Sequence, residues 1–141
     1  MVGVWAVAAW MRLGRPRRLR IVELGPGRGT LMADLLRSTA PFRDFAAALS
    51  VHLVDVSPAL CKVQWGALRC AEGPGEREGA GEAGTEGAVR RGRSTWSQIP
   101  VSWYPSLDDV PGGVPALYIL HEFVDALPVH QVSVVGIDML T

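Results

Sequence analysis

Three glycines at alternate positions follow a carboxylate in the segment 23–31, which reads ELGPGRGTL. Glycine lets the backbone approach a ligand closely, and the first N–H groups of a following helix are free to bind one. In α/β proteins, a strand that turns through such glycines into a helix binds nucleotides. We therefore predict a cofactor-binding loop, whose candidate residues are Glu23, Gly25, Gly27 and Gly29.

The glycine spacing and the charge of Glu23 bear on which nucleotide binds. Dinucleotide-binding loops follow the pattern G-x-G-x-x-G, whereas Thr30 stands at the position of its last glycine. No Gly-Lys-Ser/Thr sequence follows, which excludes a phosphate-binding P-loop. Glu23 would repel a pyrophosphate but attract an amino group. The loop thus favours S-adenosylmethionine, which carries an ammonium group and no phosphate, over a nicotinamide or flavin dinucleotide.

A second carboxylate, Asp55, follows the apolar run 50–54, which predicts a buried strand. The end of the neighbouring strand is where α/β proteins bind a ribose, and one carboxylate can accept hydrogen bonds from both ribose hydroxyls. Each acid alone has a simpler interpretation as a charge near a helix N-terminus. Together, the two acids and the glycine loop predict an S-adenosylmethionine site at the ends of two strands.

The elements that position these residues alternate between strands and helices. Apolar runs predict strands at 19–24, 50–54, 99–104, 116–120 and 129–135, and helices at 30–38 and 58–68. A first helix ends at Gly14, and its predicted buried face consists of Val4, Val7, Ala8 and Met11. This order predicts an α/β, Rossmann-like fold with a parallel sheet, incomplete at its C-terminal side.

Composition limits the remaining possibilities. The chain has 141 residues, zero formal net charge and 48% hydrophobic residues, which indicates one globular domain and gives no support for nucleic-acid binding. No apolar run approaches the length of a membrane span, and the spacing of Cys61 and Cys70 suggests neither a disulfide nor a metal site. The segment 71–95, rich in Gly, Glu, Arg and Ala, is predicted to be a disordered insertion between ordered parts at 1–70 and 96–135, with a tail at 136–141.

Several blocks of the chain resemble successive blocks of the MidA-like methyltransferase family: VELGPGRGTLMADLLR, VHLVDVSPAL, PVSWYPSLDDVP and LHEFVDALPVH. The resemblance implies a seven-strand methyltransferase fold, with Glu23, Gly25 and Gly27 on the methionine part of S-adenosylmethionine and Asp55 on its ribose. For function it implies symmetric dimethylation of an arginine in a subunit of respiratory complex I, in the mitochondrial matrix. GVWAVAAWMRLG also resembles the helix before the family's first strand, which argues against reading the arginine-rich start of the chain as a presequence.

The catalytic candidates for arginine methylation are His121, Glu122 and Asp125. A guanidinium stays protonated in water, so carboxylates must orient it and accept charge as it reacts. One helical turn would bring Glu122 and Asp125 onto the same face, where they could bind the guanidinium. Each of these acids can equally be a helix N-terminal charge, and His121 can be either a proton acceptor or a hydrogen-bonding loop residue.

The sequence also departs from the family pattern. Asp55 stands where the family commonly has glutamate, and the segment 71–95 replaces an ordered connection. Family members are longer on both sides, and the tail VVGIDMLT does not resemble their continuation, so we expect a truncated or alternative product. A noncatalytic binding or assembly module is therefore the alternative function. The sequence leaves the oligomeric state open.

Overall fold

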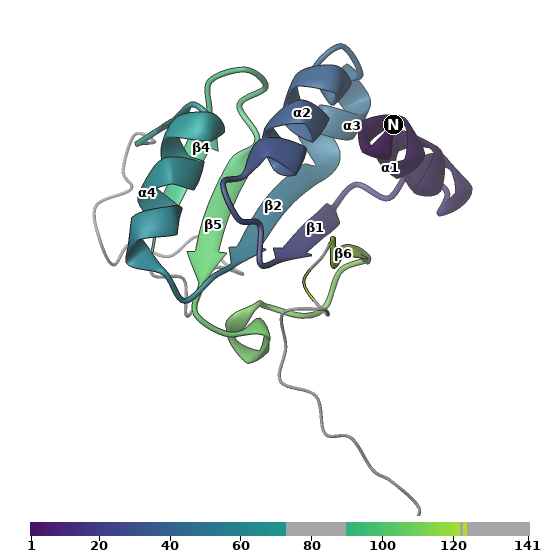
Figure 1. The fold of residues 1–141 in the computed structure, drawn as a ribbon. Coiled ribbons are helices and arrows are strands. Elements are labelled where there is room, and N and C mark those ends of the chain that lie inside the picture. The colour runs from purple at the N-terminus through teal and green to yellow at the C-terminus, as the bar shows by residue number, and fades with distance from the viewer. Residues whose placement is uncertain (73–89, 122, 124–141) are drawn as a thin grey trace, which may run out of the picture.

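The computed structural model describes residues 1–72, 90–121 and 123. Its elements, shown in Figure 1, are α1 (Val2–Arg12), β1 (Leu19–Leu24), α2 (Thr30–Thr39), α3 (Arg43–Ala48), β2 (Leu49–Val54), α4 (Pro58–Ala67), β3 (Cys70–Ala71), β4 (Arg90–Ser94), β5 (Pro100–Tyr104), the 3₁₀ turn η1 (Leu107–Asp109) and β6 (Ala116–Ile119). The strand predicted at 129–135 lies outside the described residues.

The strands form one sheet in the order β3-β4-β5-β2-β1-β6. β1 is parallel to both β2 and β6, and β2 is parallel to β5. The chain therefore passes from β1 to β2, continues to β3 at the far edge, and returns through β4 to β5 beside β2. It then crosses to β6 on the other side of β1. Such a reversal opens a crevice beyond the carboxyl ends of the strands, where open α/β sheets bind their ligands. The predicted α/β, Rossmann-like fold is confirmed, and in the described residues it is partial.

The prediction of disorder over 71–95 is wrong at both ends, because Ala71 pairs with Arg93 and β4 pairs antiparallel with β5. Residues 73–89 of this segment lie outside the described residues. The side chain of Trp65, in α4, packs against β4 and so stabilises this strand. The guanidinium carbon of Arg90 lies 3.9 Å from the centre of a Trp65 ring, and a Cβ atom at Gly92 would lie 2.5 Å from the same side chain. Composition does not reveal that a distant tryptophan covers this arginine-rich strand. β3 and β4 also make the sheet mixed rather than entirely parallel.

Helix α1 buries a different face from the one predicted. Val7 is buried as expected, but Val4 is 68% exposed and Met11 is 46% exposed. The buried residues are Gly3, Ala6, Val7 and Trp10. Small residues on this face let α1 approach α2 so closely that a Cβ atom at Gly3 would lie 2.3 Å from Ser38 Oγ. The apolar pattern was misleading because both faces of this helix carry large apolar residues.

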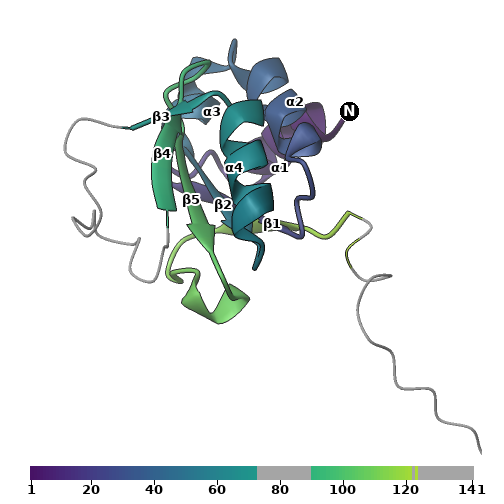
Figure 2. The same cartoon turned by 60° about the vertical axis from the view of Figure 1, so that its left-hand side comes forward.

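The main core lies on one face of the sheet, where Figure 2 shows α1, α2 and α4. Alternate residues of the central strands point into it. Its members from the strands and their ends are Leu19, Ile21, Leu49, Val51, Leu53, Ile99, Val101 and Trp103. Within the described residues, no helix is both long enough and apolar enough to cross a membrane.

The two valines of α1 test the corrected helix face. We expect Val7→Ala to lower the free energy of unfolding by about 1–3 kcal/mol, because it removes buried apolar atoms from the core. Val4→Ala makes the same chemical change on an exposed position and is expected to alter stability by less than about 0.5 kcal/mol. Urea unfolding of both variants measures the difference. Equal losses would contradict the observed orientation of α1.

Candidate functional site

The loop between β1 and α2 is bent by three glycines with left-handed backbone angles. The φ angles of Gly25, Gly27 and Gly29 are +61°, +55° and +78°. The N–H of Gly25 donates to the Val54 carbonyl at 3.0 Å, which fixes the loop against the end of β2. The sequence therefore needs glycine here for conformation, as the motif predicts.

The three glycines differ in what surrounds them. A Cβ atom at Gly29 would lie 3.3 Å from the Cα of Gln64, so this glycine allows α4 to pack on the loop. A Cβ atom at Gly25 would lie 2.4 Å from the Phe123 ring. A Cβ atom at Gly27 would meet nothing within 4 Å. Gly27 is therefore the glycine whose surroundings leave room for a ligand against the backbone.

Glu23 precedes this loop and is almost completely buried, with 3% exposure. It is the fifth residue of β1 and is paired in the sheet with Leu53 of β2 and Ile119 of β6. Its Oε2 atom has no hydrogen-bond partner in the structure as described. Burial raises the pKa of this carboxyl from 4.5 to about 7, because the charged form loses its hydration. An unpartnered buried acid at a strand end suits a ligand that brings a cation or a donor.

Asp55 is held in a fixed orientation at the end of β2. Its Oδ1 accepts a hydrogen bond from the Ser57 N–H at 2.9 Å, and its Oδ2 accepts one from Gln64 Nε2 at 2.7 Å. A carboxylate oxygen has more than one lone pair, so both oxygens keep acceptor capacity. Because β1 and β2 are parallel and Leu24 pairs with Val54, Asp55 stands beside the loop that begins at Gly25.

Gln64 is the site residue that sequence reasoning missed. It is fully buried in α4, and its Nε2 atom also donates to the Gly27 carbonyl at 2.8 Å. The sequence did contain a signal: Gln64 interrupts an otherwise apolar helix stripe formed by Cys61, Trp65 and Leu68. A polar residue on such a stripe must have buried partners.

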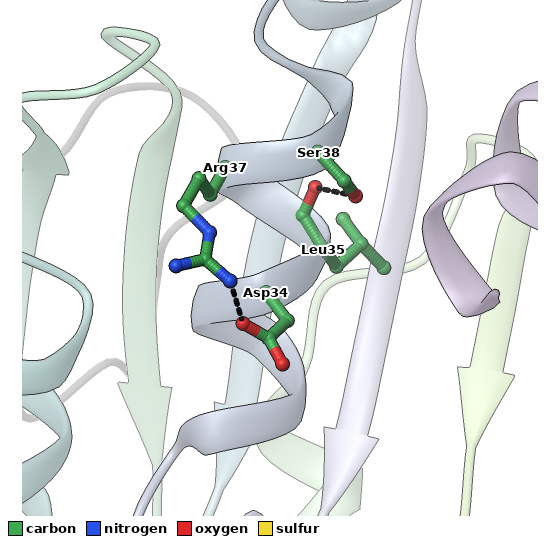
Figure 3. A network of polar contacts seen from close by, with 4 residues as sticks. All are labelled: Asp34, Leu35, Arg37 and Ser38. Carbon is green, nitrogen blue, oxygen red and sulfur yellow. Dashed lines mark hydrogen bonds and ion pairs between the residues drawn. The ribbon is translucent and has the colours of Figure 1, made fainter.

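The predicted catalytic group is described only in part, since Glu122 and Asp125 lie outside the described residues. His121 is exposed and borders a hollow of about 490 Å³. The other residues that line this hollow are Met1, Val2, Gly3, Thr30, Leu31, Asp34, Leu35, Arg37 and Ser38. Figure 3 shows four of these residues, all on α2, where Arg37 binds Asp34 at 2.7 Å and the Ser38 hydroxyl donates to the Leu35 carbonyl. The ion pair is solvent-exposed and therefore contributes little to stability.

The structure places the glycine loop and the two acids at the carboxyl ends of β1 and β2, where α/β proteins bind nucleotide-like cofactors. The sequence profile of a family of S-adenosyl-L-methionine-dependent methyltransferases matches residues 1–138. The chain belongs to this family, which confirms the resemblance seen in the sequence.

Curated relatives carry the name protein arginine methyltransferase NDUFAF7, mitochondrial. This chain is 42% identical to the one from Mus musculus over 133 residues, 40% identical to that from Xenopus laevis over 135 residues and 40% identical to that from Homo sapiens over 136 residues. These alignments cover 93–94% of this chain but 29% of each relative. The chain therefore spans less than a third of the length of these relatives.

The residues present fit S-adenosylmethionine. The unpartnered Oε2 atom of Glu23 suits an ammonium group, and the free lone pairs of Asp55 suit ribose hydroxyls. The open surroundings of Gly27 leave space for ligand atoms beside the backbone. No group in this arrangement requires a phosphate, in keeping with the preference for S-adenosylmethionine over a dinucleotide.

The buried acid predicts a pH dependence of stability. An unfolded chain releases the Glu23 proton near pH 4.5, whereas the folded chain holds it up to about pH 7. The resulting stabilisation is complete below pH 4.5 and is lost as the pH rises through 7. We expect wild type to lose about 3 kcal/mol relative to Glu23→Gln between about pH 4 and about pH 8.

Urea unfolding across this pH range measures the difference between the two proteins. Glu72→Gln, on an exposed glutamate, is the matched control and should follow wild type at every pH. Parallel curves for wild type and Glu23→Gln would contradict the burial of an unpartnered carboxyl.

Proposed function

We propose that this chain carries the cofactor-binding part of an S-adenosylmethionine-dependent protein arginine methyltransferase that acts in mitochondria. The observation that carries the proposal is the buried, unpartnered carboxylate of Glu23 beside an open glycine loop and the oriented Asp55. The acceptor class and the location come from the names of the relatives. The family resemblance extends the proposal to symmetric dimethylation of an arginine in a respiratory complex I subunit, in the matrix.

The described residues would bind the cofactor through charge and hydrogen bonds. Glu23 in its ionised form would accept hydrogen bonds from the ammonium group, which would give the buried carboxylate the partner it lacks. Asp55 would accept hydrogen bonds from the two ribose hydroxyls. Gly27 would let the cofactor lie against the backbone, since no side chain fills the space there.

S-adenosylmethionine supplies an electrophilic methyl group, which moves from its sulfur to a guanidinium nitrogen of the protein substrate. We assign Glu122 and Asp125 to hold the guanidinium in line with the methyl group, because carboxylates bind it with a defined geometry. His121 would take up the proton that the methylated nitrogen loses. These three roles come from the sequence and from chemistry.

Calorimetric titration with S-adenosylmethionine tests the cofactor site. Wild type is expected to bind saturably, and Gly27→Val and Asp55→Ala are each expected to weaken binding by at least about tenfold. The valine would fill the open space at the loop, and the alanine would remove the acceptor for the ribose.

Gly14→Val is the matched control, because Gly14 also has a positive φ, +79°, and open surroundings, but ends α1 away from the site. It should carry a similar backbone strain and leave the affinity unchanged. Tighter binding of a nicotinamide dinucleotide than of S-adenosylmethionine would refute the proposal. Cofactor binding without methyl transfer to arginine-containing protein substrates would instead favour the noncatalytic module.

A further inference from the structure

Gln64 joins the two halves of the candidate cofactor site through one fully buried side-chain amide. Its Nε2 atom donates to the carbonyl of Gly27 at 2.8 Å and to Asp55 Oδ2 at 2.7 Å. Its Oε1 atom accepts a hydrogen bond from the indole nitrogen of Trp103 at 2.9 Å. The loop after β1, the end of β2 and a core residue of β5 thus meet at one residue of α4.

The chemistry of the three partners allows only one orientation of this amide. The Trp103 indole N–H can only donate, so it needs the amide oxygen. The Gly27 carbonyl and the Asp55 carboxylate can only accept, so they need the two N–H groups of the amide. A flipped amide would leave all three partners without this bond, and the loss would be most costly for the indole N–H of Trp103, which is fully buried. Both donors of Gln64 are therefore committed to the site.

We propose that Gln64 is a positioning residue that sets the distance between the glycine loop and the ribose-binding carboxylate. This inference rests on the proposed function, because it concerns how the same cofactor site is shaped. Gln64 does not need to contact the cofactor. It holds the Gly27 carbonyl toward α4 and, together with the Ser57 N–H, leaves Asp55 one orientation. A fixed carboxylate binds a diol without the entropy cost of ordering it first.

Gln64→Glu separates this role from simple support of the core. Glutamate has nearly the same shape and keeps an oxygen for the Trp103 indole. It replaces the amide nitrogen with an oxygen that faces two acceptors, so the bonds to Gly27 and Asp55 cannot both form. Trp103→Phe makes the converse change, because it removes the indole donor and leaves both bonds from Nε2 in place.

The experiment measures S-adenosylmethionine affinity by calorimetry and, without ligand, the hydrogen-exchange protection of the Trp103 indole by NMR. We expect Gln64→Glu to weaken binding at least about tenfold while the indole proton stays protected. Gln64→Met, which removes all three bonds, should weaken binding and also expose the indole proton to exchange. Trp103→Phe should remain within about threefold of the wild-type affinity. Circular dichroism checks the fold of each variant.

Wild-type affinity in Gln64→Glu would overturn the inference while leaving the proposed function intact. An equal loss in Trp103→Phe and Gln64→Glu would also overturn it, because support of the core would then explain both. Absence of S-adenosylmethionine binding by folded wild type would refute the proposed function, and the inference with it. If Gln64→Met does not fold, Gln64→Glu decides the matter, since it retains the size and the indole bond.

Discussion

The parallel register of β1 and β2 is the constraint on which the site depends. Leu24 pairs with Val54, and the Gly25 N–H continues the ladder to the Val54 carbonyl. Because of this register, the glycine loop and Asp55 follow their strands at the same level along the strand direction, so they lie side by side. A slip of one residue would turn every side chain of β1 to the other face and separate the two acids from their neighbours. The core supports the register, since Leu19 and Ile21 are buried against the helices on one face.

Strand β1 also contains a residue that lowers the stability of the fold. Glu23 lies near the C-terminal end of β1, between β2 and β6, with an unpartnered oxygen, where an apolar residue would be more stable. Residues that lower stability in this way are concentrated at functional sites. In contrast to Glu23, the side chains of Asp55 and Gln64 have hydrogen-bond partners within the protein. Glu23 thus has an oxygen with no partner among the described residues, whereas Asp55 and Gln64 are already oriented by theirs.

The sequence predicts the fold correctly where the local pattern of apolar residues matches the pattern of burial. It predicted the strands at 19–24 and 50–54, the helix after the glycine loop and the family. Prediction from the sequence fails where two segments or residues have the same local pattern and only a contact with a distant residue distinguishes them. Val4 and Val7 have the same side chain in the same helix, and only the close approach at Gly3 selects which one is buried. Strand β4 depends on Trp65, and the role of Gln64 depends on Trp103, 39 residues away. The local sequence indicates that Gln64 needs buried partners, but it does not identify Trp103 as one of them, and it does not identify Trp65 as the cover of β4.

The pairing of β3 with β4 has a consequence for how the connection between these strands can vary in length. Cys70 pairs with Ser94 and Ala71 with Arg93, so the chain leaves the sheet and re-enters it at adjacent strands. With both ends fixed side by side, the entropy of closing the connection rises only slowly as residues are added. β3 and β4 also lie at the opposite edge of the sheet from β6. Insertions and deletions between them can therefore accumulate during evolution with little effect on the geometry of the cofactor loop.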